Sequence, residues 1–428
     1  MLLSLLFIAF FGKATLCSIL LVETNVSSDA GKPKTPSYDI KFLQNPIYTV
    51  ACNIDPFAGG LPTPLLIQNN SFIYPQGAGN KNLKFTAGEN IDLACPEGAL
   101  ILRDVEFSSL VTATCLSDTT FTINSTSYKW SEIRCSDNPK AIVELTPALC
   151  ETDGTKVRIG YEIAKSEFVK NLEVCFNTTG QFPMYSYYEL IPAIDQEITG
   201  TPTPTFDQGP DVYEIGNINT LYTLFTQRAT INGQLGMTSD NATYIQNNDD
   251  YVLARGHLAG GPDFFYASQQ NSTYYYENAL PQWQTFHDSN WEHVETDVRN
   301  YASHNNVQLQ IWTGGYGITT LPHADTGVET PLFLYVIRSE SAIPIPEVFW
   351  KVVYNPKNQL GIVLIGANNP YKTPQQINKF CVDVSSSLSW LTWEKDDQIK
   401  GISWACDVDD FRKSFNNFPA FNVMGLLK

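Results

Sequence analysis

A group of side chains suited to chemistry on a phosphodiester bond lies between residues 255 and 299. The group consists of a candidate general base, His257; two guanidinium groups, Arg255 and Arg299; an amide, Asn278; and a carboxylate, Glu295. A base, oxygen groups that hold a metal ion or its waters, and cations that bind phosphate are the components of metal-assisted phosphodiester cleavage. An isolated Arg-Gly-His is weak evidence for a catalytic site, because most surface histidines have no catalytic role. The prediction therefore rests on the complete set of five residues in this order.

The elements around this group follow from residue types and spacing. Residues 251–254 predict a strand that delivers Arg255 and His257 at its end, with Gly256 allowing a tight turn between them. The aromatic segments 263–266 and 273–276 are expected to pair as a hairpin. A helix is then predicted from Ser289, whose N-cap position and Glu292 three residues later form a capping box. Glu295 and Arg299 are four residues apart, so both share one face of this helix and face the strand end.

Two strands followed by a helix, with Arg255-Gly256-His257, Asn278-Ala279-Leu280-Pro281-Gln282 and the Glu295–Arg299 spacing, resemble the DNA/RNA non-specific endonuclease family. The active site of that family has a ββα-metal fold. The sequence is most similar to the secreted insect branch, the gut and salivary double-stranded ribonucleases, and also to nuclease-like salivary proteins of blood-feeding flies, the tsetse Tsal type. The resemblance covers residues from about 150 to 410 and is sharpest over 251–299.

The resemblance implies a site with one divalent metal ion, Mg²⁺ or Mn²⁺. It also implies a nucleic-acid substrate, DNA and RNA, bound through the phosphate backbone without sequence preference. In such a site His257 would activate water as the general base, and Arg255 and Arg299 would hold the phosphate. Asn278 would orient the site, and Glu295 would hold the water shell of the metal.

Two positions depart from the family pattern. Many members have Asp before the Arg-Gly-His, where this chain has Ala254, a change associated with the insect branch. The usual direct metal ligand is an Asn, and His287 occupies that position. Imidazole is a poorer ligand for the hard Mg²⁺ ion than an amide oxygen and suits softer ions better. The metal site is therefore expected to be weakened, retuned to another ion, or supported by the neighbouring Asp288 or Asn290.

Composition limits the partners of the protein. The 428 residues carry a net charge of −17, from 44 acidic and 27 basic residues, so nucleic acid is not attracted to the molecule as a whole. A local basic groove or a bound cation must neutralise the phosphates. Arg228 is a further candidate for phosphate contact, and Lys351, Lys357, Lys372 and Lys379 are weaker candidates, for which a solvated surface position is favoured.

The N-terminus and the cysteines indicate secretion. Residues 2–11 form an apolar run too short to cross a membrane and end before Gly12-Lys13, which is typical of a signal peptide spanning 1–17. No other run is long enough to cross a membrane. Cleavage after Cys17 would leave eight cysteines, an even set that predicts four disulfides in an extracellular protein, with Cys381–Cys406 as the preferred pair. Six Asn-x-Ser/Thr sequons fit the same compartment: Asn25, Asn69, Asn124, Asn177, Asn241 and Asn271.

The fold class expected from these patterns is α+β, with a central antiparallel sheet in the nuclease-like domain. Residues 18–38 are expected to form a flexible arm. Short aromatic and β-branched segments separated by turns predict a small, disulfide-stapled β-rich module over 39–150, which is taken to be structural or substrate-positioning. The endonuclease-like domain then spans 151–428.

Two functions are compatible with the sequence. The first is a secreted, metal-dependent, sugar-nonspecific endonuclease acting on DNA and RNA, with activity weakened by His287. The second is a nucleic-acid-binding protein on a nuclease fold, with residual or no catalysis. His287 and the acidic charge favour the second, whereas the complete set of His257, Arg255, Glu295 and Arg299 favours the enzyme.

Overall fold

The structure is a computed structural model that describes residues 18–23, 38–43, 50–151, 154–164, 167–200, 202–338, 340–415 and 417–428. The predicted signal peptide, Cys17 and the sequon at Asn25 lie outside these residues. Part of the predicted arm is β1 (Ser18–Glu23), which pairs antiparallel with β2 (Tyr38–Leu43). Among the described residues, no helix is long and apolar enough to cross a lipid bilayer.

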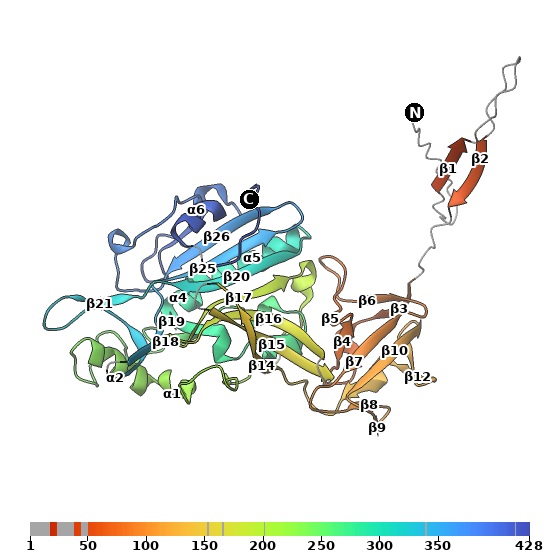
Figure 1. Ribbon diagram of the computed structural model, residues 1–428, viewed down its shortest axis with the longest axis horizontal. Helices are drawn as coiled ribbons and strands as arrows, with labels where there is room; N and C mark the ends of the chain where they lie inside the picture. The colour runs from red at the N-terminus through yellow and green to blue at the C-terminus, as the bar shows by residue number, and fades with distance from the viewer. Residues whose placement is uncertain are drawn as a thin grey trace, which may run out of the picture.

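A nine-stranded sheet forms the centre of the larger part of the molecule (Figure 1). Its main path runs in the order β14 (Ile142–Leu149), β15 (Gly154–Ala164), β16 (Glu167–Asn177), β17 (Phe182–Leu190), β20 (Leu309–Tyr316), β25 (Val348–Asn355), β26 (Leu360–Ala367) and β27 (Ser403–Cys406). Neighbours on this path are antiparallel, and the short β28 (Gly425–Leu426) adds parallel to β26. The α+β class and the central antiparallel sheet are confirmed.

The two faces of this sheet are covered by different elements, because side chains alternate along each strand. On one face, Phe349 of β25 packs against Trp291 in the segment that leads into helix α5 (Glu292–His304). On the other, Trp350 packs against Phe411 of α6 (Val408–Ser414) and the residues after it. Figure 1 shows α6 over β26, away from α5. The sheet is thus buried on both sides.

The predicted ββα arrangement is present, but its strands differ from those expected. β18 (Leu253–His257) pairs antiparallel with β19 (Ala279–Trp283), and His257 lies opposite Ala279. The expected hairpin of 263–266 with 273–276 is wrong. That connection instead contains the 3-10 turn η4 (Gly261–Asp263), the short helix α3 (Ala267–Asn271) and the turn η5 (Tyr276–Asn278).

The helix of the ββα unit begins earlier than predicted and is kinked. α4 (Gln284–Phe286) continues into the π-helical segment η6 (His287–Trp291) and then into α5. Ser289 has non-helical dihedral angles at the kink, so the predicted capping box from Ser289 to Glu292 is absent. The apolar residues that recur at the helical period lie against the core: Trp291, Val294 and Val298 are buried, and Tyr301 is partly buried.

Residues 221–226, which have the composition of a strand, are helical. α1 (Ile218–Leu221) is followed by α2 (Leu224–Gln234), whose N-cap is Thr223 with its side chain accepting from the backbone of Thr226. The remaining elements of this part are the hairpins β21 (Thr320–Pro322) with β22 (Glu329–Pro331) and β23 (Phe333–Ile337) with β24 (Glu340–Pro344), and the 3-10 turns η3 (Pro192–Gln196), η7 (Pro374–Gln376) and η8 (Ser385–Ser387).

The N-terminal module is built from short strands, as the sequence predicted. A six-stranded sheet runs in the order β12 (Thr126–Lys129), β11 (Thr120–Ile123), β10 (Leu110–Ser117), β7 (Asn90–Ala94), β4 (Leu65–Gln68) and β5 (Ser71–Phe72). Smaller sheets contain β3 (Val50–Ile54) with β6 (Leu83–Thr86), and β13 (Ile133–Cys135) with β8 (Leu100–Leu102) and β9 (Val105–Glu106); the turns η1 (Pro56–Ala58) and η2 (Trp130–Glu132) complete the module. Within the range expected for the module, β14 belongs to the large sheet.

The module packs on the connection between β18 and β19. Phe57 lies 5.1 Å from Phe265, and Tyr74 stacks on Tyr266 at 5.9 Å, both measured between ring centroids. The Tyr266 hydroxyl donates to the carbonyl of Ile73. The module therefore supports the segment that leaves the end of β18.

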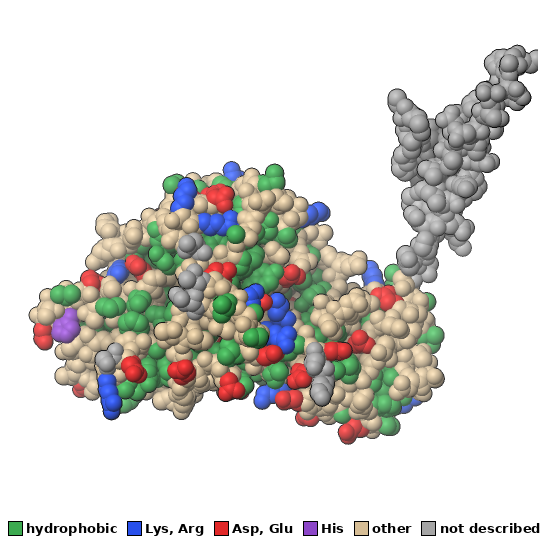
Figure 2. Space-filling model, in the orientation of Figure 1, with side chains coloured by type: hydrophobic (Ala, Val, Ile, Leu, Met, Phe, Trp, Pro, Cys, Tyr) green, Lys and Arg blue, Asp and Glu red, His purple; other side chains and the backbone are tan. Residues whose placement is uncertain are grey.

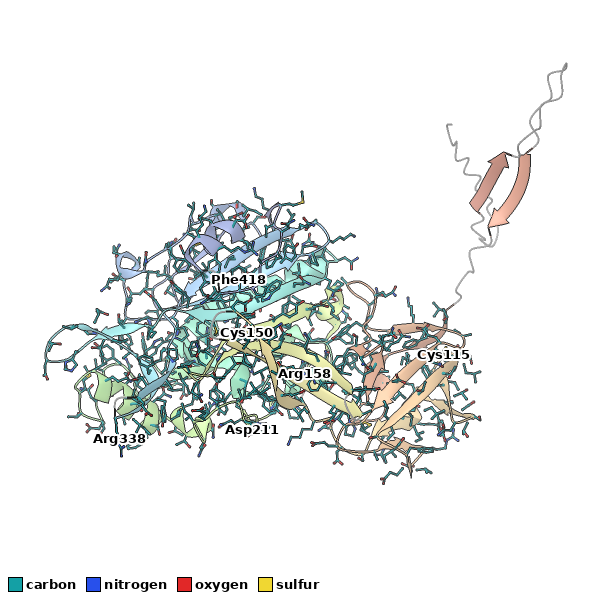
Figure 3. The ribbon with its side chains drawn as sticks, in the orientation of Figure 1. Cys115, Cys150, Arg158, Asp211, Arg338 and Phe418 are labelled. Carbon is teal, nitrogen blue, oxygen red and sulfur yellow. A yellow bond between two sulfur atoms is a disulfide. The ribbon has the colours of Figure 1, made fainter. Side chains whose placement is uncertain are left out.

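Four disulfides staple the described chain, as the cysteine count predicted. Two lie inside the module, Cys52–Cys115 and Cys95–Cys135. Cys150 joins Cys175 in the large sheet, and Cys381 joins Cys406, the pair preferred from sequence. Figure 3 labels Cys115 in the module and Cys150 at the large sheet.

Candidate active site

His257 is the last residue of β18, and its ring lies between two aromatic side chains. Phe206 and Tyr274 both have ring centroids 4.8 Å from the imidazole. Nε2 is buried with no hydrogen-bond partner among the described residues. Burial, with a smaller contribution from His287, lowers the pKa of His257 to about 3. The imidazole is therefore neutral at neutral pH and has a lone pair with which to accept a proton.

Arg255 lies two residues before His257 on the same strand, and its side chain is held by residues far away in the sequence. Nε donates to the hydroxyl of Tyr276 at 3.1 Å, and Nη2 donates to Oδ1 of Asn219 at 2.6 Å. The guanidinium also lies over the ring of Tyr222, 4.9 Å from its centroid. These contacts fix the plane of the guanidinium and leave Nη1 without a hydrogen bond in the described part of the chain.

Arg299, on α5, pairs with Asp263 of the turn η4. Nη1 lies 2.9 Å from Oδ1 of Asp263, whose side chain is 3% exposed, against 18% for Arg299. Oδ2 of Asp263 accepts a hydrogen bond from the Tyr188 hydroxyl of β17. Asp263 thus links the end of β18, the helix and the sheet.

A fully buried lysine lies behind this pair. Nζ of Lys351, on β25, donates to Thr313 Oγ1 at 2.7 Å and to the Tyr188 hydroxyl at 3.3 Å. Burial lowers the pKa of Lys351, whereas the nearby carboxylates of Asp263 and Glu295 raise it. Because Lys351 has no exposed surface, it does not reach a phosphate but balances the charge of these carboxylates.

Glu295 faces the residues that follow His257. A Cβ atom placed on Gly260 would lie 3.7 Å from both Glu295 carboxylate oxygens. Among the described residues, no hydrogen bond or ion pair engages this carboxylate. Burial raises the pKa of Glu295 to about 7, and Lys351 opposes the increase. The structure therefore brings Glu295 to the strand end, as its place on the helix predicted.

Asn278 is completely buried, and both Oδ1 and Nδ2 of its side chain form hydrogen bonds within the protein. Oδ1 accepts from the backbone N–H of Ala259 at 3.0 Å and from Ser186 Oγ at 2.8 Å. Nδ2 donates to the carbonyls of Ala259 and Thr273, both at 2.9 Å. This geometry fits the orienting role, because the amide ties the chain after His257 to β19 and the sheet, and leaves no oxygen lone pair for a metal.

His287 lies on η6 and is positioned by Gln282 of β19. Its Nδ1 is 2.9 Å from Oε1 of Gln282, so Nδ1 carries the hydrogen and Nε2 keeps its lone pair. Burial lowers the pKa of His287, which favours the neutral, ligating form. Of the two proposed supporting residues, Asn290 has its amide bonded to Glu394 and Gly401, whereas Asp288 is exposed and accepts from Gln284.

Gly256 has a different role from the one predicted. It lies inside β18 and has no positive φ, so it does not form a tight turn. A Cβ at this position would lie 2.4 Å from Oε1 and 2.7 Å from Cβ of Gln282. The glycine is therefore required by the close approach of the side chain that holds His287.

Arg228 and three of the four candidate lysines are buried or have partners within the protein. Arg228 donates to the carbonyl of Ile245 at 2.8 Å and to Oδ1 of Asn247 at 2.7 Å, which braces the loop after α2. Lys351 is buried, and Lys372 and Lys379 lie near acidic partners. Figure 2 shows acidic and basic side chains both spread over the visible face, with one group of Lys and Arg side chains near its middle.

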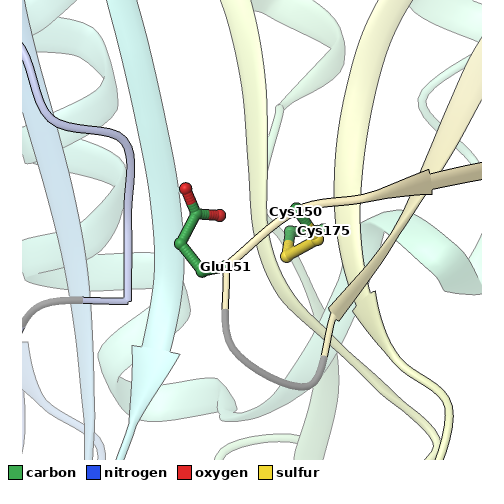
Figure 4. Close-up of side chains that lie close together, drawn as sticks. All are labelled: Cys150, Glu151 and Cys175. Atoms are coloured by element: carbon green, nitrogen blue, oxygen red, sulfur yellow. A yellow bond between two sulfur atoms is a disulfide. The ribbon is translucent and has the colours of Figure 1, made fainter.

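The donor set fits a divalent cation. An imidazole with an available Nε2 and a carboxylate without a hydrogen-bond partner are ligands, direct or through water, for Mn²⁺, Zn²⁺ or Mg²⁺. Among the described residues, the one group of three or more ligating side chains with the spacing of a metal site is Cys150, Glu151 and Cys175, and it is excluded because its two sulfurs are bonded to each other (Figure 4).

Several residues of the site were missed from the sequence. They are Asp263 and Tyr188 behind Arg299, Gln282 beside His287, and Phe206, Asn219, Tyr222 and Tyr276 around Arg255 and His257; Lys351 was considered, but as a surface residue instead of a buried one. Asp263 follows His257 closely in Gly-Gly-Pro-Asp, which is the only local signal. The others come from distant strands and loops, or from a strand pairing that was not predicted.

The fold is that of a nuclease family. Residues 153–411 match the family described as DNA/RNA non-specific endonuclease, and the chain belongs to this family. It is 27% identical over 413 residues to a salivary endonuclease of Lutzomyia longipalpis, covering 94% of this chain and 89% of the relative. It is 25% identical over 298 residues to salivary protein Tsal1 of Glossina morsitans morsitans, covering 69% and 72%. A solved EndoG/EndoGI complex is similar with a TM-score of 0.36 and 14% identity, covering 61% of this chain and 89% of that one.

Proposed function

We propose that the protein is a secreted endonuclease that requires a divalent metal and cleaves phosphodiester bonds in DNA and RNA irrespective of the sugar. The observation that carries this proposal is that the candidate base and the candidate metal ligands lie close to the end of β18. His257 lies near His287, and Glu295 faces the residues that follow His257. A neutral base beside a candidate cation site is the arrangement that hydrolysis of a phosphodiester needs.

Each residue has a role that its contacts support. His257 takes a proton from the attacking water. Arg255 presents Nη1, since its other nitrogens are tied to Tyr276 and Asn219, and this fixed orientation suits a phosphate oxygen. Arg299 adds positive charge from the other side, oriented by Asp263.

The remaining residues hold the cation and the backbone. His287 Nε2 would be the direct ligand, Glu295 would hold metal-bound waters, and Asn278 fixes the chain after His257. The divalent cation would stabilise the charge that develops on the phosphate oxygens and add to the positive charge of the arginines in a protein with a net charge of −17.

Secretion is supported by two observations. The four disulfides of the described chain require an oxidising compartment. The relatives from Lutzomyia and Glossina are named as salivary proteins.

A second function is favoured by specific features of the site. His287 replaces the usual metal-ligand Asn, and Arg299 is engaged by a buried carboxylate, so phosphate contact must compete with an existing ion pair. These features suit a protein that binds nucleic acid on a nuclease fold with residual or no cleavage.

One experiment separates the two. Supercoiled plasmid and long RNA are incubated with the wild type and with His257→Ala in Mg²⁺, Mn²⁺ or EDTA, and binding is measured in EDTA by gel shift. An endonuclease cuts both substrates in at least one metal, and His257→Ala lowers the rate by about 10²–10⁴ with unchanged affinity. Binding without cutting in either metal would support the binding protein. Equal rates for the two proteins would assign the activity to another site.

A further inference from the structure

A cavity beside the candidate active site has no assigned role. It has a volume of about 240 Å³ and lies between the segment that ends at Pro204 and the connection that starts at Gly261. This is smaller than the ~300–1,000 Å³ of pockets for drug-sized ligands and suits a single planar ring system. Tyr274, Pro204 and Pro262 supply flat or rigid apolar walls, and the Thr203 side chain is hydrogen-bonded to Tyr274.

Tyr274 joins this cavity to His257. Its ring lines the cavity, and its centroid is 4.8 Å from that of the His257 imidazole. Phe206 contacts both rings, at 5.2 Å from Tyr274 and 4.8 Å from His257. A group bound in the cavity is therefore one aromatic ring away from the base that activates water.

The charge of the cavity excludes a phosphate. Glu197 is the only charged residue among the described residues that line it. A phosphate would be repelled there, whereas a neutral, planar group with hydrogen-bonding edges fits an aromatic wall and polar side chains. The bases are the only part of a nucleic acid with this chemistry.

We propose that this cavity is a nucleobase subsite, in which the base next to the scissile phosphate, turned out of its stack, packs on Tyr274. This proposal rests on the proposed nuclease function. It names a part of the substrate that the enzyme recognises besides the phosphate backbone. Stacking of any base on an aromatic ring is tolerant of sequence, so the subsite is compatible with non-specific cleavage. It favours strands whose bases are unpaired.

The test uses labelled single strands that carry one abasic residue at a defined position, with cleavage mapped at each phosphate. The wild type should cut the phosphate beside the abasic residue about tenfold more slowly than the same phosphate in the intact strand. Tyr274→Leu keeps an apolar side chain against His257 but removes the aromatic face. It should cut intact strands more slowly and lose the discrimination, whereas Tyr274→Phe, which keeps the aromatic face, should retain the discrimination between intact and abasic strands. Phe225→Ala, an exposed aromatic residue on α2, is the matched control.

The affinity of the wild type for intact and for abasic strands, measured in EDTA, tests the subsite without cleavage. Preference for the intact strand supports the subsite even if no metal supports cutting, in which case only the nuclease function fails. Equal cutting and equal binding of both strands would overturn the subsite without contradicting the nuclease function.

Asn271 lines the cavity and begins a glycosylation sequon, so the presence of carbohydrate on Asn271 is determined by mass spectrometry. Discrimination seen only with Asn271→Gln would show that a glycan fills the cavity, and would overturn the proposal.

Discussion

Arg299 and Asp263 form an ion pair of 2.9 Å in which the carboxylate is 3% exposed. The arginine lies on the helix of the ββα unit and the carboxylate on the turn after His257. On the sheet side, the Tyr188 hydroxyl donates to Asp263, and Lys351 donates to the Tyr188 hydroxyl. The position of the guanidinium is therefore set by residues that do not take part in the proposed chemistry.

Replacing Asp263 with Asn should destabilise the protein by about 3 kcal/mol, because it leaves Arg299 and the buried Lys351 without one of their carboxylate partners. The free energy of unfolding is measured with denaturant. Asp396→Asn is the control, since Asp396 is 76% exposed in its pair with Lys395 and its loss should change stability by less than about 0.5 kcal/mol. Equal effects of the two substitutions would mean that the buried pair is not structurally important.

Gly256→Ala should destabilise by about 1–3 kcal/mol, since the new Cβ collides with Gln282. Displacing Gln282 also releases His287, so the affinity for Mn²⁺, measured by calorimetry, should fall. Gly233→Ala on α2 is the matched control: nothing lies within 4 Å of the added atom, and alanine favours a helix, so stability should rise slightly. A fully stable Gly256→Ala protein would contradict the close approach described here.

The contribution of Glu277 to stability should decrease as the pH rises from about 4.5 to 7. This side chain is completely buried, it accepts hydrogen bonds from the backbone of Gly209 and from its own backbone N–H, and burial raises its pKa to about 7. The folded-state pKa lies above the unfolded value, so the stabilising contribution is complete at low pH and is lost as the pH rises through 7. The loss is about 3 kcal/mol.

Unfolding with urea at several pH values measures the Glu277 contribution. Glu277→Gln should flatten the decrease over this range, and Glu106→Gln, an exposed substitution, should leave it in place. An unchanged slope in Glu277→Gln would assign the pH dependence to other groups.

His287→Asn should raise Mg²⁺-dependent cleavage at least about tenfold, which corresponds to roughly 1.4 kcal/mol of barrier. An amide oxygen suits Mg²⁺ better than imidazole, whereas Mn²⁺ and softer ions should bind more weakly to the variant. Metal affinity measured by calorimetry provides a readout independent of turnover. An unchanged or lower rate, with the wild type already fast in Mg²⁺, would show that the histidine is no defect and would remove the main support for the binding-only alternative.

The parts of the site that follow local rules could be predicted. Glu295 and Arg299 share a helix face because of their spacing, and Trp291 and Val294 are buried because apolar residues recur at the helical period. The pair Cys381–Cys406 was predictable because these two cysteines are isolated at the end of the chain.

The parts that depend on long-range packing could not be predicted. Residues 263–266 have the composition of a strand, but Phe265 and Tyr266 are buried against Phe57 and Tyr74 of the module instead of pairing in a sheet. Lys351 looks like a surface lysine in sequence, because its partners Tyr188 and Thr313 come from other strands.

The contact between the N-terminal module and the β18–β19 connection has a consequence for where the enzyme begins. The family match starts at residue 153, yet Phe57 and Tyr74 cover the aromatic side chains next to Asp263, and β14 forms the edge of the large sheet. A fragment cut at the family boundary would expose Phe265 and Tyr266 to water and leave β15 as an unprotected edge, open to association with other chains. The autonomous folding unit of this nuclease is therefore larger than the segment that defines its family.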